Sequence, residues 1–267
     1  MKALIYLLIV LSITHSSCKF TLAVHGGAGS WQRDKISKET EVEVKMGILE
    51  SLKAGYQILK NNGTHLDAVE AAIVVLEDNP HFNAGKGAKI NQNLEVELDS
   101  SIMDGSSLRC GAVAAVKKIK NPVKAARLVM DTTEHIMLSG EGADKYAESK
   151  QLNIVDNSYF FTIDRVVEFL ENRKSKKIGT IGAVALDSFG NLAAATSTGG
   201  FNNKMPGRIG DSPIIGAGNY ANSNTVSISC TGNGEEMMRR VLAHDVHARM
   251  KYKGISMNKA LNEVFSK

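Results

Sequence analysis

Three threonines stand next to glycine where a strand is expected to begin or end: Thr180, Thr198 and Thr231. A threonine hydroxyl is a weak nucleophile unless a neighbouring base takes its proton. On the local pattern alone, Thr180 is typical of a strand start, because threonine favours strands and glycine marks turns. The rest of the chain has to decide whether these threonines do chemistry.

Other kinds of catalytic site find little support in the sequence. A Gly-x-Ser-x-Gly motif, which would carry the nucleophile of a serine esterase, is absent from the chain. The histidines and cysteines do not have the spacing of a metal site. His244 and His247, three residues apart, are interpreted as part of a solvated helix face.

Arg208 and Asp211 lie in a loop with almost no apolar content. An arginine can hold a carboxylate through two parallel hydrogen bonds, and an aspartate can bind an ammonium group. The two side chains would therefore suit the α-carboxylate and α-amine of a free amino-acid end. Alternatively, they pair with each other.

The composition is that of a globular protein with one large domain or two small ones. Of 267 residues, 43% are hydrophobic and 22% are charged, and the formal net charge is only +4. The one dense basic run, residues 173–177, lacks the interleaved aromatic residues that single-stranded nucleic acid favours. We therefore expect no nucleic-acid partner and interpret the run as part of a mobile connector.

Residues 1–17 have the pattern of a secretory signal peptide, with Lys2 before an apolar run and two serines after it. The run is too short for a permanent membrane span, so we expect no membrane attachment after its removal. The alternative is a buried N-terminal strand. The pattern predicts a secreted or lumenal protein, extracellular, periplasmic or lysosomal according to the host. The glycosylation triplet at residues 62–64 adds weak support.

The elements expected in the first half are helices over a sheet. Apolar residues spaced by three and four predict helices over 40–59 and from residue 64 or 65 to 79. Strands are expected at 20–24, 95–99 and 110–116. Further helices are predicted at 122–138 and 141–149. Residues 150–178 have no clear period and are predicted to form a mobile linker, ending at Gly179.

The second half is predicted to be richer in strands. Residues 181–186 and 192–196 flank a turn signature and predict a hairpin. A strand at 225–230 turns into a helix that starts at Glu235. Strands in hairpins, with helices before and after them, predict antiparallel sheets with helical layers outside. Three cysteines do not make a disulfide framework, although Cys110 and Cys230 could pair.

Read together, these segments resemble the plant-type asparaginase and isoaspartyl peptidase family, whose members are N-terminal-nucleophile (Ntn) hydrolases. The resemblance extends from Leu22 to about Arg249. Each motif is weak alone, but their occurrence in one order is highly specific. The motifs are residues 25–29, 79–85, 99–105, 179–184, 196–200, 207–213, 216–218 and 231–234.

The resemblance implies an α+β fold, a four-layer αββα sandwich of two antiparallel sheets between helical layers. It also implies a precursor that cuts itself between Gly179 and Thr180. Residues 18–179 would then correspond to an α-subunit and residues 180–267 to a β-subunit. The freed α-amine of Thr180, with a pKa of about 7.7–8.0, would act as base for its own hydroxyl.

The family's functional residues carry over onto matching positions. Thr198 is expected to bond the hydroxyl of Thr180, and Thr231 and the Gly232 N–H to form the oxyanion hole, aided by Asn83. Arg208 and Asp211 would bind the α-carboxylate and α-amine of L-asparagine or an isoaspartyl dipeptide. The remaining substrate-binding positions are Ile209, Gly210, Asn233 and Gly234.

The family also implies a structural sodium ion and an oligomer. Relatives hold sodium by backbone oxygens in a stretch matching Leu76, Glu77, Phe82, Ala84 and Lys86. No other cofactor is expected. The implied assembly is a dimer of cleaved αβ heterodimers.

Two alternatives remain open. The glycosylasparaginases, a lysosomal sister class, would suit the signal pattern, but Gly179 and residues 82–85 match the asparaginase branch. Family members also continue beyond the last expected helix into further strands that the given sequence does not include, so we expect either a fragment of a longer chain or an inactive product. A family member that keeps the fold but not the activity is therefore the second alternative.

Overall fold

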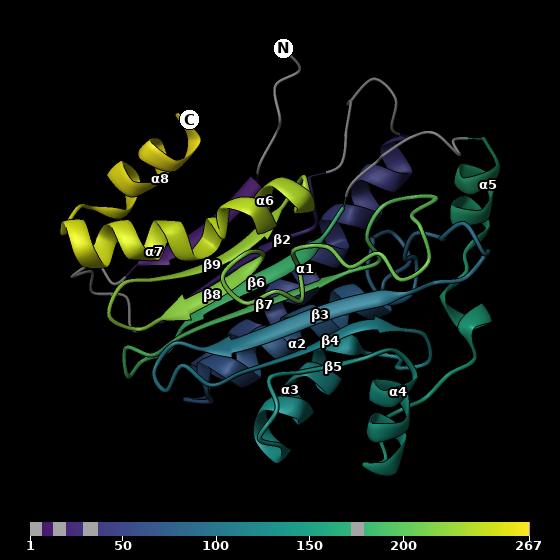
Figure 1. Cartoon of the computed structure of the whole chain (residues 1–267), viewed down its shortest axis with the longest axis horizontal. Helices are drawn as coiled ribbons and strands as arrows, with labels where there is room; N and C mark the ends of the chain where they lie inside the picture. Colours follow the sequence, from purple (N-terminus) through teal and green to yellow (C-terminus); the bar gives the residue numbers. More distant parts are fainter. Residues whose placement is uncertain (1–6, 13–19, 29–36, 172–178, 267) are drawn as a thin grey trace.

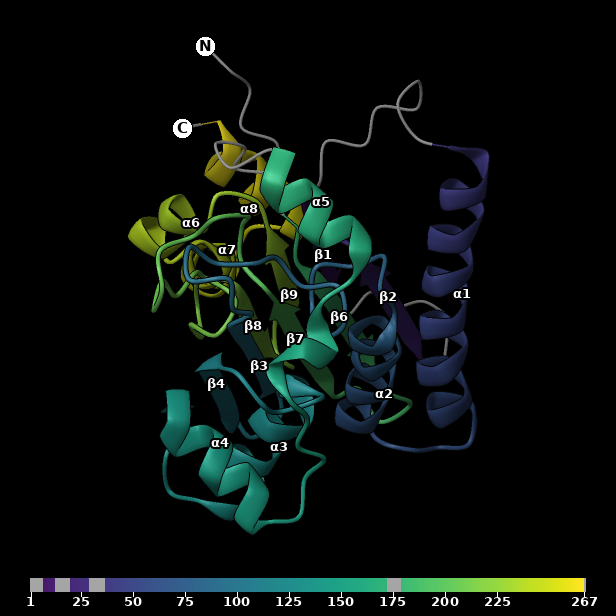
Figure 2. The same ribbon diagram turned by 90° about the vertical axis from the view of Figure 1, so that its right-hand side faces the viewer.

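The computed structural model describes residues 7–12, 20–28, 37–171 and 179–266; for 7–12 it describes the backbone alone. These residues form four layers, with two sheets packed face to face between helices (Figures 1 and 2). Among them, no helix is both long and apolar enough to cross a membrane.

The larger sheet has six strands in the order β2-β6-β7-β3-β4-β5. Their bounds are β2 (Thr21–His25), β3 (Leu98–Asp104), β4 (Cys110–Val116), β5 (Met137–Ser139), β6 (Ile181–Leu186) and β7 (Leu192–Thr198). All neighbours are antiparallel except β4 and β5, which are parallel. The prediction of two purely antiparallel sheets is thus corrected for this edge. The predicted helix 122–138 ends at Thr132, and the last residues predicted for it belong to β5.

The smaller sheet has the order β1-β9-β8, with β1 (Leu7–Ser12), β8 (Asn219–Asn222) and β9 (Val226–Thr231). Strand β1 pairs antiparallel with β9 in an unbroken register from Leu7↔Thr231 to Ser12↔Val226. Residues 7–12, in the apolar run interpreted as the core of a secretory signal, are therefore a strand of the sheet. The prediction of a secreted or lumenal location, which depended on that interpretation, is wrong.

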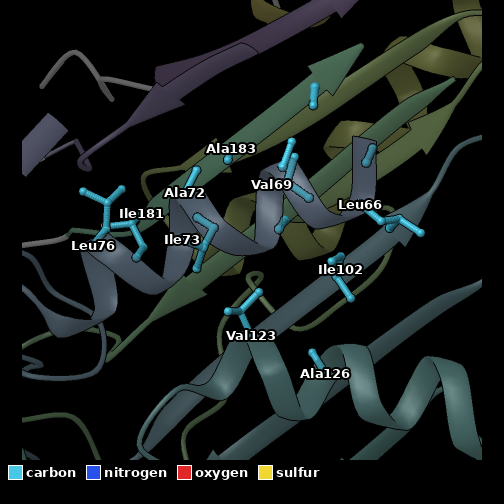
Figure 3. Packing of buried hydrophobic residues seen from close by; sticks show 14 of the residues in the cluster. Leu66, Val69, Ala72, Ile73, Leu76, Ile102, Val123, Ala126, Ile181 and Ala183 are labelled. Atoms are coloured by element: carbon cyan, nitrogen blue, oxygen red, sulfur yellow. The ribbon is translucent and has the colours of Figure 1, made fainter. Parts of the chain in front are cut away.

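Helices α1 (Lys38–Lys60), α2 (His65–Asp78) and α3 (Pro122–Thr132) cover the outer face of the larger sheet. Residues from α2 and α3 pack against β3 and β6 in a core of small and branched side chains (Figure 3). Burial of each large apolar side chain contributes about 1.5–3 kcal/mol to the stability of the folded state. This core fixes the strand that begins just after Thr180.

The apolar side chains that predicted α1 do not all face this core. Val42, Met46 and Leu49 are exposed, whereas Gly47 and Gly55 are buried. The helix packs through its small residues because they allow close approach to α2 and to the loop that follows it.

The other helices complete the outer layers. Helices α6 (Gly234–Arg240), α7 (Leu242–Lys253) and α8 (Met257–Phe265) cover the smaller sheet, and α4 (Gly140–Ser149) lies beside β4 and β5. The predicted linker at 150–178 is partly structured instead. It contains a 3-10 helix at Asn157–Phe160 and α5 (Ile163–Glu171), and its remainder, 172–178, lies outside the described residues.

Candidate active site

Thr180 lies buried at the entrance to β6, directly opposite the end of β7. The register Ile181↔Ser197 brings Thr180 and Thr198 across from each other. The hydroxyl of Thr180 donates to Oγ1 of Thr198 at 3.1 Å. The hairpin predicted from the turn signature thus places two of the three candidate threonines in contact.

The carbonyl oxygen of Gly179, the residue before Thr180, accepts two hydrogen bonds. One comes from Oγ1 of Thr198 at 2.9 Å and the other from Nδ2 of Asn83 at 2.6 Å. Nδ2 of Asn83 also donates to the Gly200 carbonyl, and its Oδ1 accepts from the Lys89 N–H. These contacts fix the amide of Asn83. Two donors aimed at one carbonyl would stabilise negative charge developing on that oxygen.

The loop after β2 packs directly on this peptide bond. Gly27 has a φ of +113°, and a Cβ added there would lie 2.9 Å from the Thr180 nitrogen. Only glycine can adopt this φ without strain and also has no side chain to collide with the Thr180 nitrogen. The next residue, Ala28, donates its N–H to Oγ1 of Thr231 at 3.2 Å. Thr231 ends β9, so this loop connects the third candidate threonine to the first.

A cavity opens beside Thr180 and collects most of the predicted site. It contains both threonines of the hairpin, both predicted charged residues and the turn that follows β9. Its lining is Thr180, Thr198, Gly200, Phe201, Arg208, Asp211, Ser212, Gly232, Asn233, Gly234 and Glu235. Of the remaining predicted residues, Asn83, Thr231 and Gly210 are buried around it, while Ile209 is half-buried and outside the lining.

The two predicted charged residues of the cavity do not pair with each other. Arg208 donates from Nε and Nη2 to one oxygen of Glu235, at 3.1 and 3.0 Å. Asp211 is buried, and its Oδ2 has no hydrogen-bond partner among the described residues. Burial raises the pKa of Asp211 to about 7. A buried carboxyl with an oxygen that lacks a hydrogen-bond partner is suited to binding an ammonium group, because the cation would lower that pKa.

Sequence reasoning missed a buried polar chain behind the nucleophile. Nε2 of His25 contacts Oγ of Ser229 at 3.0 Å, and Ser229 contacts Oγ1 of Thr196 at 2.8 Å. Burial lowers the pKa of His25 to about 4, so the ring is neutral at pH 7. The sequence offered one signal, since Ser229 and Thr231 share a face of an alternating strand.

Two buried charges below the cavity were also missed. Lys204 is fully buried and donates from Nζ to the Glu97 carbonyl at 2.8 Å. Asp99, also buried, is the strand neighbour of Thr198 and accepts from the Ala115 N–H. Burial raises the pKa of Asp99 and lowers that of Lys204. Their opposite charges support each other next to Thr198 and Gly200, which line the cavity.

The loop after α2 fits a cation held by oxygen atoms. A Cβ at Gly85 would lie 2.3 Å from the Glu77 carbonyl oxygen, and one at Gly87 would lie 3.0 Å from that of Phe82. The loop thus forms a cradle that side chains would fill, and backbone oxygens suit hard cations. A sodium ion at Leu76, Glu77, Phe82, Ala84 and Lys86 stays a proposal. Among the described residues, no cluster of His, Cys, Asp or Glu could hold a metal.

Comparison with known proteins adds to this geometry. The family model described as "Asparaginase" matches residues 18–177 and 167–267. A putative isoaspartyl peptidase/L-asparaginase of Dictyostelium discoideum is 44% identical, over 92% of this chain and 83% of the relative. The isoaspartyl peptidase of Salmonella typhimurium is 43% identical over the same shares. The isoaspartyl peptidase/L-asparaginase of Mus musculus is 48% identical, over 83% of this chain and 70% of the relative.

The predicted enzyme class and the predicted fold of the Ntn hydrolases are thereby confirmed, apart from the parallel edge strand. The match includes both sides of the junction between Gly179 and Thr180. The chain belongs to the asparaginase family.

Proposed function

We propose that the protein hydrolyses the side-chain amide of L-asparagine and the β-linked peptide bond of isoaspartyl dipeptides. Thr180 is the nucleophile, and it is freed when the chain cleaves itself between Gly179 and Thr180. The observation that carries this proposal is the Gly179 carbonyl, which two donors hold beside the Thr180 hydroxyl. The names of the relatives support the substrate class.

Self-cleavage begins when Oγ1 of Thr180 attacks the carbonyl carbon of Gly179. Asn83 and Thr198 stabilise the oxyanion, because both already donate to that oxygen. The bond to the Thr180 nitrogen then breaks, the hydroxyl proton passes to that nitrogen, and an ester joins the two residues. Water hydrolyses the ester, which leaves a carboxyl group on Gly179 and a free α-amine on Thr180.

The same hydroxyl then serves in amide hydrolysis. The α-amine takes its proton, and Oγ1 attacks the carbonyl on the β-carbon of the substrate. Thr231 and the Gly232 N–H bind the oxyanion. The proton passes to the departing ammonia or peptide amine, and water hydrolyses the acyl-threonine. Self-cleavage and amide hydrolysis thus use the same nucleophile but different hydrogen-bond donors for the oxyanion.

Substrate choice follows from Arg208 and Asp211. Arg208 binds the α-carboxylate and Asp211 the α-amine, which leaves the β-carbonyl beside Thr180. An ordinary α-linked aspartyl dipeptide has an amide where the carboxylate should lie. A paired, desolvated charge that loses its partner costs about 2–5 kcal/mol, so such dipeptides are rejected by well over tenfold.

The test begins with the purified wild-type chain and Thr180→Ala on a denaturing gel. The wild type should slowly give two pieces, the smaller beginning with Thr180 by N-terminal sequencing, and the variant should stay whole. Thr132→Ala, a threonine on α3 far from the site, is the matched control. A new terminus elsewhere would rule out the assigned nucleophile.

The cleaved enzyme is then offered L-asparagine, β-linked and α-linked aspartyl-leucine, and N-acetylglucosaminyl-asparagine. Hydrolysis of the first two alone supports the proposal. Preference for the glycosylated substrate would favour the glycosylasparaginase alternative. Self-cleavage without hydrolysis of any of these substrates would favour the alternative of a family member without activity. The predicted dimer of αβ heterodimers is checked on the same sample by sedimentation.

A further inference from the structure

The guanidinium of Arg208 is held on one edge by a carboxylate of its own chain. Nε and Nη2 donate to the same Oε1 of Glu235, at 3.1 and 3.0 Å. Glu235 is the second residue of α6 and is half-exposed at the rim of the cavity. Hydrogen bonds between charged groups are stronger than neutral ones, so this contact restrains the rotation of the guanidinium.

The other sides of the guanidinium are enclosed as well. Its carbon lies 4.6 Å from the centroid of the Phe201 ring, which covers one face. A Cβ added at Gly200 or Gly210 would lie 3.3 or 2.7 Å from Nη1, and one at Gly234 would lie 3.0 Å from Nη2. Glycines of three separate segments therefore leave room for the guanidinium and for little else.

This enclosure decides which edge of Arg208 faces the substrate. Glu235 occupies the Nε–Nη2 edge. The Nη1–Nη2 edge, which includes the second N–H of Nη2, remains beside Gly200 and Gly234, which line the cavity together with Thr180. A carboxylate is bound best by two parallel N–H groups of one edge. An arginine free to rotate would present this edge only part of the time.

We propose that Glu235 is a positioning residue that orients Arg208 and thereby sets the requirement for a free α-carboxylate on the substrate. The inference rests on the proposed function, because it assigns the α-carboxylate to Arg208. In this proposal Glu235 acts only by orienting Arg208 and not on the reacting atoms. Its removal should therefore weaken binding of carboxylate-bearing substrates and leave the chemical step nearly unchanged.

The test uses Glu235→Ala and Glu235→Gln in the cleaved enzyme, with Glu236→Ala as the matched control. Glu236 lies in the same turn of α6 but pairs with Arg239 and Arg240, outside the cavity. Its removal changes the charge at the start of the helix equally. KM for L-asparagine should rise about tenfold or more in Glu235→Ala, less in Glu235→Gln, and not in Glu236→Ala, with kcat within about threefold throughout.

A second substrate separates positioning from a general structural effect. L-Asparagine α-amide has no carboxylate, so its kcat/KM should be low in the wild type and equal in Glu235→Ala. An equal loss on both substrates would mean a merely structural role. A lower KM in Glu235→Gln would mean that Glu235 competes with the substrate. Either result overturns the proposal.

Titration of L-aspartate, the reaction product, into the same proteins provides a readout without turnover. Its affinity should fall about tenfold in Glu235→Ala and stay unchanged in Glu236→Ala. If the wild type hydrolyses L-asparagine but the Glu235 variants match it, the inference alone is wrong. If the wild type neither hydrolyses L-asparagine nor binds L-aspartate, the proposed function and the inference are both wrong.

Discussion

The hydroxyl of Thr198 accepts a hydrogen bond from the hydroxyl of Thr180 at 3.1 Å and donates one to the Gly179 carbonyl at 2.9 Å. It also accepts from the Gly200 N–H at 3.0 Å, so its single proton is committed to the carbonyl. One hydroxyl therefore touches both the proposed nucleophile and the oxygen on which charge would develop.

Thr198→Val keeps the shape of this side chain but removes both contacts. We expect self-cleavage to slow by about 100-fold or more, because a donor to the developing oxyanion is lost together with the acceptor that orients Thr180. Thr198→Ser should keep most of the rate. The measurement is a time course on denaturing gels, and an unchanged rate in Thr198→Val would show that the contact is not used.

Asn83→Asp replaces the amide donor with a carboxylate of the same shape facing the Gly179 carbonyl. Self-cleavage should fall by about 10²–10³-fold, the cost of losing one oxyanion-hole donor, with repulsion added. Asn121→Asp, a buried asparagine beside Asp78, is a control for burying the new charge. Normal cleavage in Asn83→Asp would exclude Asn83 from this step.

Asp211 should make substrate binding depend on pH. Burial raises its pKa to about 7, so the carboxyl is protonated, and unable to bind an ammonium ion, below that pH. KM for L-asparagine should therefore rise as the pH falls below about 7, approaching tenfold per unit, and level off above it. In Asp211→Asn, KM should be high and independent of pH over this range. A flat KM profile in the wild type would contradict the assignment.

His65 should matter for stability and not for chemistry. Its Nδ1 and Nε2 contact Asp187 and Asp104 at 2.8 and 2.9 Å, which joins the start of α2 to the ends of β3 and β6. His65→Ala leaves two carboxylates without this partner, at a cost of about 2–4 kcal/mol. We expect Tm to fall by roughly 4–12 °C in thermal unfolding, with no change in His135→Ala, whose side chain is exposed.

The sequence predicts best where local pattern and tertiary packing agree. Strands β4 and β6 have their predicted bounds, because continuous apolar runs between turn signals are buried on both faces. Helix α1 is correctly placed, but its buried face was not predicted. The buried side combines Gly47 and Gly55 with Val44 and Ile48, which were not part of the predicted apolar face.

Helix α5 was missed although its sequence carries a helical pattern. It is held to the body by Arg165, Glu168 and the buried ring of Phe169, whereas Ile163 and Leu170 are exposed. The apolar residues of this helix, at positions 163, 166, 167 and 170, have helical spacing, so the helix was predictable from the sequence. What the pattern does not predict is that this apolar face is exposed while charged residues face inward.

The site was predictable as far as the family motifs extend. Thr180, Thr198, Arg208 and Asp211 share one cavity, as expected from the resemblance. The partner of Arg208 was not predictable, because a glutamate in the first turn of a helix has the ordinary interpretation of a favourable charge near the helix dipole.

Strand β6 lies between β2 and β7 in the larger sheet, and it begins one residue after Thr180. Most amino termini fray, because nothing holds the first residues on either side. A terminus created at Thr180 would instead be anchored from both flanks, by the Val24↔Ala183 and Ile181↔Ser197 pairs. Cutting the chain there would produce an amino end with the order of a strand interior.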